Sequence, residues 1–367
     1  MPENAPRSEV AQTCLIVGAG IIGASIAFRL ARSGCQVTLI DAVGPHAGAS
    51  GRSWAWINAI AADTPSYVAL RRAGIDAYHR LEQDLSGRLE IDWSGSIVWD
   101  SGLFDPDADY AGRQDLRRVD STEIRTLEPM LAAPPAAALY SPDDGLIDGA
   151  HATGAILAAA AEAGARTVYG LPADGVIVEK SRAGGVTCGD AVLRADTTIL
   201  CAGTGTADLL ASLGRDLPMR NRPGLLVTTR PVSAKLSRAI WTETTHVKQL
   251  RDGRLLIGES AHRDGALHDP EKLAAAMLQD AGALLPGCAP LQLERYTVAT
   301  RPIPADGYPV IGPVDGLAGL YVATMHSGMT LAAIVGELVS EEVIRGESPD
   351  MLAAFRPGRF PGMIRKD

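Results

Sequence analysis

The sequence Cys14-Leu-Ile-Val-Gly-Ala-Gly-Ile-Ile-Gly23, with the residues that follow it to Asp41, decides the fold of this chain. The apolar run 15–17 is bounded by glycine, which is typical of a buried parallel strand. Small and apolar residues of 24–32 lie on one face of a predicted helix. A second apolar run, 37–40, predicts the next strand, and Asp41 follows it. The stretch therefore predicts a strand–helix–strand unit at the start of an α/β domain.

Three glycines in the first turn, Gly18, Gly20 and Gly23, have the spacing G-x-G-x-x-G. They allow a tight turn, a close approach of a pyrophosphate, and close packing of helix on strand. Free N–H groups and the helix dipole favour bound phosphate there. Asp41 is placed to accept hydrogen bonds from an adenosine ribose, which disfavours NADP. An ordinary strand–helix–strand unit is the alternative, but the order of these features favours a dinucleotide of the FAD or NAD type.

Composition and charge argue against several other classes of protein. Apolar residues are 46% and charged residues 21%, as in ordinary globular enzymes. A net charge of −9 without any basic run disfavours nucleic acid as a partner. We find no apolar window long enough for a membrane span, no signal peptide in the polar N-terminal segment and no metal-ligand spacing among the cysteines and histidines. We therefore expect a cytoplasmic protein with no membrane span, no disulfide and no metal.

Three further segments bear on the ligand. Segment 44–58 is rich in small residues that offer hydroxyl and N–H groups, and then has Trp54 and Trp56, which a flexible surface turn would not explain. An apolar strand ending at 201 turns at an Ala-Gly pair into a helix. Near the C-terminus, the segment Arg301-Pro-Ile-Pro-Ala-Asp-Gly-Tyr-Pro-Val-Ile-Gly312 precedes a strand, a glycine-containing loop and a final helix expected at 332–345. Elsewhere, the patterns at 91–100 and 270–284 predict a strand and a helix.

Together these segments resemble the D-amino-acid oxidase, glycine oxidase and sarcosine oxidase family of FAD-dependent enzymes, over nearly the whole chain. The C-terminal return of that family reaches the flavin, and NAD-dependent dehydrogenases do not need it, so the resemblance implies FAD. It also implies an α/β fold with a discontinuous, Rossmann-like FAD-binding domain and a second α+β substrate domain with an antiparallel sheet. The FAD-binding domain would comprise residues 10–60, 140–215 and 300–367, and the substrate domain residues 61–139 and 216–299.

The resemblance assigns cofactor contacts one position at a time. The pyrophosphate and ribose contacts are Gly18, Ala19, Gly20, Ile22, Gly23, Asp41 and Ala42. The loop along the diphosphate and ribityl chain is Ser50, Gly51, Arg52, Ser53 and Trp54. Contacts near the adenosine are Ala173, Ala202 and Gly203. Contacts near the pyrimidine carbonyls of the flavin are His326, Ser327, Gly328, Met329 and Thr330.

Two residues are catalytic candidates. Arg301 matches the arginine that holds a substrate carboxylate in glycine oxidase-like members, and its structural alternative is a salt bridge. His326 is a possible helper, for which a flavin contact is the simpler role. Sarcosine oxidases also have a cysteine bonded to the flavin, where this chain has Ala299 and Thr300. The resemblance therefore implies non-covalent FAD.

The electron acceptor is less defined. Sarcosine oxidases place a lysine over the flavin for oxygen activation, but the matching strand 255–258 has none, and Lys248 lies on the other strand of that hairpin. The acceptor is expected to be oxygen or another acceptor such as a quinone. The implied reaction is oxidation of the C–N bond of a small amine, an amino acid or N-methyl amino acid, by hydride transfer to flavin N5 and hydrolysis of the imine. Oxidation of a 2-hydroxy acid and a non-catalytic flavin-binding subunit remain as alternatives.

Overall fold

The structure is a computed structural model that describes residues 11–60, 63–107, 110, 113, 115–220, 222–259 and 269–364. Most of the polar N-terminal segment lies outside these residues. No helix of the described residues is both long and apolar enough to cross a membrane. Nor do the described residues bring three metal-ligating side chains together.

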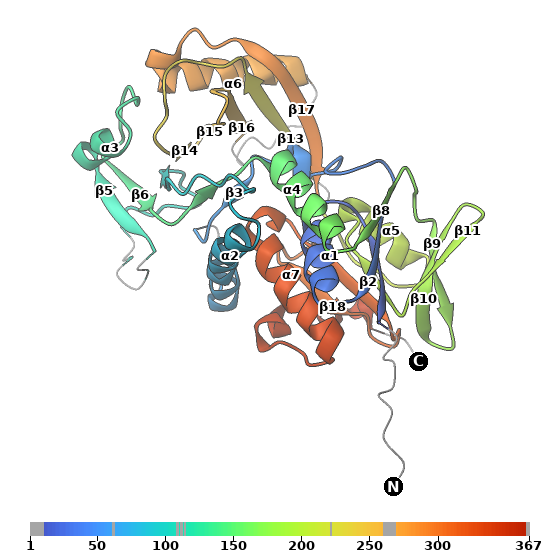
Figure 1. The fold of residues 1–367 in the computed structure, drawn as a ribbon. Coiled ribbons are helices and arrows are strands. Elements are labelled where there is room, and N and C mark those ends of the chain that lie inside the picture. Colours follow the sequence, from blue (N-terminus) through green and yellow to red (C-terminus); the bar gives the residue numbers. More distant parts are fainter. Residues whose placement is uncertain are drawn as a thin grey trace.

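A six-stranded sheet forms around the N-terminal unit (Figure 1). Its order is β18-β19-β12-β1-β2-β8, and only β18 runs antiparallel to its neighbour. The strands are β1 (Thr13–Val17), β2 (Gln36–Asp41), β8 (Arg166–Tyr169), β12 (Thr197–Leu200), β18 (Val310–Pro313) and β19 (Leu320–Thr324). Three separate parts of the sequence therefore build one sheet.

Both faces of this sheet are covered, which explains the continuous apolar run in β1. Cys14 and Ile16 face a core shared with α1 (Ile21–Arg32), α4 (Gly149–Glu162) and α7 (Gly328–Arg345). Leu15 and Val17 face a second core on the other side. That core includes residues of β9 (Gly175–Glu179), β10 (Arg182–Cys188), β11 (Ala191–Arg194) and α5 (Thr206–Ala211).

An eight-stranded sheet forms the other half of the molecule, with the order β17-β13-β16-β15-β14-β4-β6-β5. Its strands are β4 (Ser96–Val98), β5 (Arg117–Asp120), β6 (Ala137–Ser141), β13 (Arg222–Thr229), β14 (Ala239–Trp241), β15 (Thr245–Gln249), β16 (Leu255–Glu259) and β17 (Leu293–Arg301). Helix α6 (Pro270–Leu284) packs on β13, β15, β16 and β17. All but one of the neighbouring pairs are antiparallel.

Smaller elements connect the two sheets. Helix α2 (Pro65–Asp84) packs against α7, and α3 (Ser121–Leu127) begins at a capping box formed by Asp120 and Glu123. Two short strands, β3 (Trp56–Ile57) and β7 (Gly145–Leu146), pair with each other. The mixed fold confirms the predicted α/β class with an antiparallel second sheet, whereas the division of the chain into two discontinuous domains stays a prediction.

Two elements differ from the sequence expectation. The pattern at 91–100 predicts one strand, but only β4 forms, because Gly95 adopts a φ of 82° and interrupts the extended backbone. The final helix begins at Gly328 rather than at Ala332, so the glycine-containing loop is its first turn. That earlier start determines which N–H groups face the adjacent cavity.

Candidate active site

A cavity of about 630 Å³, here called the glycine cavity, lies where β1, β2, β12 and β19 end. Parallel strands typically bind ligands at this edge of an α/β sheet. Of the predicted cofactor residues, it is lined by Gly18, Gly20, Ile22, Asp41, Ala42, Ser50, Arg52, Ala173, Ala202, Gly203, His326, Gly328 and Met329. Segments separated by hundreds of residues thus meet at one site, as the resemblance implies.

The three glycines of the first turn differ in what a side chain at each position would meet. A Cβ on Gly18 would lie 2.4 Å from the oxygen of Cys201, and one on Gly23 would lie 2.0 Å from the oxygen of Gly18. At Gly18 and Gly23, therefore, the protein backbone leaves no room for a side chain. A Cβ on Gly20 would approach only the hydroxyl of Ser50, at 3.1 Å, and Gly20 has ordinary extended dihedral angles. The space next to Gly20 therefore belongs to the cavity.

Asp41 already accepts hydrogen bonds from main-chain N–H groups. Its carboxylate binds the amide nitrogens of Ala19 at 2.8 Å, Val43 at 2.8 Å and Gly44 at 2.9 Å. A carboxylate has about four acceptor positions, so it can still accept from a ribose. Its structural role is to fix the turn after β2, and the ribose contact stays a prediction.

Some predicted cofactor residues support the shape of the cavity. Ser50 lines it, and its Oγ accepts a hydrogen bond from the Ile21 amide at 2.9 Å, in the first turn of α1. A Cβ on Gly51 would lie 2.4 Å from the oxygen of His46, so Gly51 permits a tight loop. Ala19, Gly23 and Gly51 are not among the residues that line the two main cavities.

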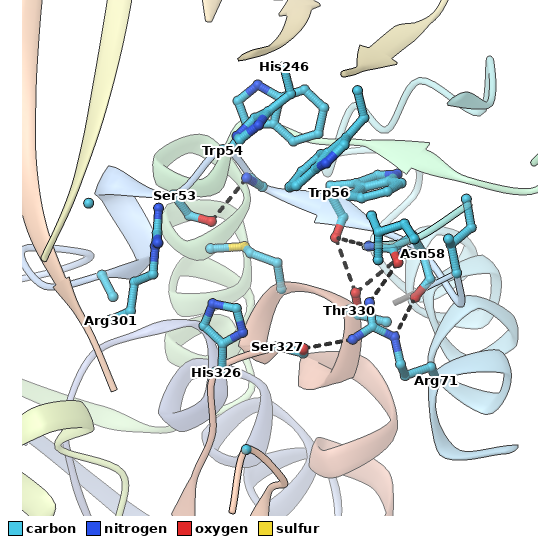
Figure 2. Close-up of a pocket in the computed structure, with 18 of the residues that line it drawn as sticks. Ser53, Trp54, Trp56, Asn58, Arg71, His246, Arg301, His326, Ser327 and Thr330 are labelled. Carbon is cyan, nitrogen blue, oxygen red and sulfur yellow. Dashed lines mark hydrogen bonds between the residues drawn. The ribbon is translucent and has the colours of Figure 1, made fainter. Parts of the chain in front are cut away.

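A second cavity of about 680 Å³, here called the arginine cavity, adjoins the first. Both are lined by Ala49, Arg52, Ala299, Pro302, His326 and Met329. The predicted residues Ser53, Trp54, Ser327 and Thr330 line only the second cavity, together with Arg301. Figure 2 shows Arg301 and Arg71 on opposite sides of this cavity, with His326 between them.

Arg301 stands at the end of β17, where the sheet leaves room for its side chain. The guanidinium lies over Gly224 of the neighbouring strand, where a Cβ would come within 2.5 Å of Nη2. Its Nη2 is 3.6 Å from Glu259 Oε1, which is an ion pair too long for a hydrogen bond. Burial lowers the pKa of Arg301 and Glu259 opposes this shift. Arginine still stays charged, so the cavity has a cation whose hydrogen-bonding groups are not saturated by Glu259.

Two histidines of the cavity are neutral near pH 7. Burial, with the charges of Arg301 and Arg71, lowers the pKa of His326 to about 4. Burial and Arg301 lower the pKa of His246 well below its ordinary value. Neither side chain can donate a proton as an imidazolium at that pH. A catalytic role for His326 stays a prediction, and it would have to be that of a neutral ring.

Arg71 is a functional candidate that the sequence did not reveal. This residue of α2 is 3% exposed, and no carboxylate of the described residues forms an ion pair with it. Its Nε and Nη2 donate to the oxygen and to Oδ1 of Asn58, at 2.9 and 2.7 Å, and Nη1 donates to Ser327 Oγ at 2.7 Å. It therefore places a buried cation beside the first turn of α7 (Figure 2). A polar position in an amphipathic helix gives no local sign of such a role.

An aromatic wall, formed by Trp54, Trp56, Trp241 and His246, lines the same cavity. Trp54 and Trp56 are each 7% exposed, which confirms that the small-residue segment ends in buried tryptophans. No local pattern indicates that Trp241 and His246 would join them, because they come from β14 and β15 and meet only through strand pairing.

Lys248 lies behind this wall. Its Nζ donates to the oxygens of Ala55 and Ile147, at 2.8 and 2.6 Å. Burial lowers its pKa to about 7. It lies on the strand opposite 255–258, as the sequence predicts, where it pairs with Leu256, and it is not among the residues lining either main cavity. Its contacts fix the loop that contains Trp54.

Comparison with known proteins agrees with this geometry. The family model described as FAD dependent oxidoreductase matches residues 13–342. Glycine oxidase of Pseudomonas aeruginosa is 27% identical over 363 residues, covering 93% of this chain and 96% of that protein. An opine oxidase chain of Agrobacterium tumefaciens is 24% identical over 376 residues, covering 94% and 96%.

Solved structures show the same fold. Glycine oxidase from Geobacillus kaustophilus superposes with a TM-score of 0.84 at 23% identity, covering 95% of this chain and 100% of that one. Iminodiacetate oxidase from Chelativorans superposes with a TM-score of 0.80 at 26% identity, covering 94% and 98%. The family model alone covers most of the chain. The chain therefore belongs to the family of FAD-dependent oxidoreductases.

Proposed function

We propose that this enzyme oxidises the C–N bond of a small amine that has a carboxylate, an amino acid or N-methyl amino acid. The observation that supports this proposal most directly is Arg301, a cation in a cavity that adjoins the glycine cavity. A guanidinium binds a carboxylate through two parallel hydrogen bonds. Relatives are named as oxidases of glycine and of iminodiacetate, both small amines with a carboxylate, which favours the same chemistry here.

The residues of both cavities fit FAD. The open space beside Gly20 and the first turn of α1 suit a pyrophosphate, and the first turn of α7 at the junction of the cavities suits the polar end of the ring. We assign to these contacts the predicted cofactor residues that line the two cavities. Ala299 and Thr300 line the glycine cavity, and no thiol stands at those positions to bond a flavin.

In this proposal the flavin supplies the acceptor for a hydride from the carbon next to nitrogen. The substrate also loses a proton from nitrogen, which leaves an imine, and water hydrolyses it to a carbonyl compound and an amine. Arg301 holds the carboxylate, and the neutral His326 and His246 add no further positive charge to that of the three arginines, Arg52, Arg71 and Arg301, that line the same cavity. Oxygen or another acceptor then takes up the electrons.

Two alternatives differ in class. A 2-hydroxy acid could bind Arg301 equally well and be oxidised at its C–O bond. A non-catalytic flavin-binding subunit is disfavoured, because the buried, charged arginine cavity would then have no purpose.

Anaerobic mixing of the purified yellow protein with amino acids, N-methyl amino acids, amines and 2-hydroxy acids separates these functions. Bleaching of the flavin by amines with a carboxylate is expected. Bleaching by hydroxy acids alone would replace the proposal with the first alternative, and no bleaching by any member would favour the second. The same reduced enzyme, mixed with oxygen or with a quinone in a stopped-flow instrument, identifies the acceptor.

A further inference from the structure

We infer that the aromatic wall binds the side chain of the substrate, and that the preferred substrate is an amino acid with an aromatic or large apolar side chain. This inference rests on the proposed function, and deepens it by naming the class of side chain.

The wall is a continuous aromatic surface. His246 and Trp241 are stacked, with ring centroids 3.8 Å apart and planes 3° apart. Trp241 also stacks on Trp56 at 4.9 Å and 29°. Trp54 stands edge-on to all three, with interplanar angles between 77° and 82°. Rings this close leave no space between them for a ligand, so any ligand must lie against the outside of the stack.

The N–H group of each indole in the wall is paired through a hydrogen bond. Trp54 Nε1 donates to the oxygen of Leu256 at 3.0 Å, and Trp56 Nε1 donates to Asp144 Oδ2 at 2.8 Å. Trp241 Nε1 donates to Asp100 Oδ2 at 3.3 Å. Asp144 is fully buried and also accepts hydrogen bonds from Ser96 and Ser141. With these N–H groups paired, the three indoles offer mainly carbon and π surface, whereas Asp100, which pairs with Trp241, also lines the cavity.

The aromatic wall and Arg301, which would hold the substrate carboxylate, line the same cavity. Trp241, His246 and Arg301 all come from the eight-stranded sheet, and they line the arginine cavity but not the glycine cavity. The guanidinium of Arg301 lies over Gly224 of β13, and the ring of His246 lies over Gly258 of β16, the strand that pairs with β13, so Arg301 is near the stack. Leu103 and Leu226 line the same cavity and extend its apolar surface. A substrate held by its carboxylate at Arg301 therefore meets an apolar aromatic surface.

Arg301 and the aromatic wall together would select substrates by the size and polarity of their side chains. Aromatic rings gain from stacked or edge-on contacts in addition to the area they bury. Each methylene that an apolar pocket buries changes kcat/KM by roughly 10- to 200-fold. Glycine and sarcosine have no side chain to place on the wall, and a charged side chain would lose its hydration there.

The first test uses the wild-type enzyme. We would measure kcat/KM for alanine, leucine and phenylalanine, in the enantiomer that reduces the flavin, and for glycine and sarcosine. Phenylalanine or leucine is expected to exceed alanine by about 100-fold, given the pocket discrimination above. Glycine or sarcosine as the best substrate would overturn the inference and leave C–N oxidation intact. Failure of every amino acid would instead count against the proposed function.

The second test uses variants. Trp241→Ala should lower the phenylalanine-to-alanine ratio of kcat/KM at least about tenfold, and Trp241→Phe, which keeps a ring, should lower it less. Trp93→Ala is the matched control, because Trp93 is outside the residues lining this cavity and contacts His79 and Glu82 instead. An unchanged ratio in both Trp241 variants would overturn the inference.

A binding measurement without turnover completes the design. Acetate, 4-methylpentanoate and phenylacetate retain the carboxylate but have no amine to oxidise. Titration of each into the holoenzyme, followed by the flavin absorbance, gives a dissociation constant. Phenylacetate should bind at least about tenfold more tightly than acetate in the wild type, and this preference should shrink in Trp241→Phe. Equal affinities for the three acids would contradict the proposed subsite.

Discussion

The two adjoining cavities are built in different ways. The glycine cavity is formed mainly by backbone turns at the ends of parallel strands, with small residues such as Gly20 and Ala202. The arginine cavity is formed mainly by large side chains, among them Arg71, Trp241 and Arg301. A backbone site is determined by local sequence, because each turn needs particular residues at fixed spacing. A side-chain site depends on which strands and helices happen to meet.

The largest expected effect separates folding from cofactor binding in the glycine cavity. Gly20→Val should fold, because its Cβ would approach only Ser50 Oγ, yet the added side chain would occupy the pyrophosphate space. We expect nearly complete loss of FAD with an unchanged far-ultraviolet circular dichroism spectrum. Gly154→Val is the control, since a Cβ there meets nothing within 4 Å. A yellow Gly20→Val protein with one FAD per chain would contradict the assignment of this cavity.

A second experiment asks how the cofactor is held. Because Ala299 and Thr300 stand where a flavin-linking cysteine would lie, acid precipitation should release all the FAD into the supernatant. The absorbance of pellet and supernatant gives the partition. Flavin fluorescence that stays on the denatured band in a gel would show a covalent link.

In the arginine cavity, we expect Arg301→Lys to weaken substrate binding by about 1.5–3 kcal/mol, because lysine cannot reproduce two parallel hydrogen bonds. The FAD content should not change. Arg295→Lys on the same strand is the matched control, because Arg295 is exposed and pairs with Glu294. Dissociation constants from flavin absorbance titrations measure the effect. Normal binding by Arg301→Lys, or a best substrate without a carboxylate, would remove the role of Arg301.

The smallest effect, taken over one pH unit, concerns Lys248, which holds the loop between the cavities. Burial lowers its pKa to about 7, whereas in an unfolded chain it is about 10.4. Between these values the unfolded chain binds the proton and the folded chain does not, so stability attributable to this group falls as the pH decreases from about 10 to 7. The wild-type enzyme should therefore gain stability relative to Lys248→Met as the pH rises, by at most about 1.4 kcal/mol per pH unit.

Thermal unfolding of both holoenzymes at several pH values between 7 and 10 measures this difference. The difference in stability between the two proteins cancels the contributions of other groups that titrate in the same pH range. A stability difference that stays constant over the range would show that Lys248 has an ordinary pKa in the folded enzyme.

Much of the fold could be predicted from local sequence. The run at 15–17, the glycine spacing and the helix at 270–284 depend on periodicity and turn chemistry, and the structure confirms each of them. The strand expected at 91–100 was wrong over most of its length, because the positive φ of Gly95 has no signature beyond the glycine itself.

The candidate site likewise has one part that local sequence predicts and another part that it does not. Thirteen of the predicted cofactor residues line the glycine cavity, because the resemblance rests on motifs located there. Arg71, Trp241, His246 and Glu259 line the arginine cavity and had no local signal. Trp241 meets His246 only through the register of β14 and β15, and Arg71 meets Ser327 only because α2 packs on α7. Such encounters depend on tertiary structure.

The interleaved strand order also has a consequence for synthesis. Strand β12 pairs with β1 on one side and with β19 on the other, and residues 323–326, 328 and 329 complete the glycine cavity. A growing chain emerges from the ribosome N-terminus first and folds as it emerges. Until β19 emerges, β12 has an open edge that can pair with another chain. With FAD in the glycine cavity, as we propose, the cofactor would bind only once nearly the whole polypeptide has left the ribosome. A truncation before β19 would then remove cofactor binding together with the protection of that edge.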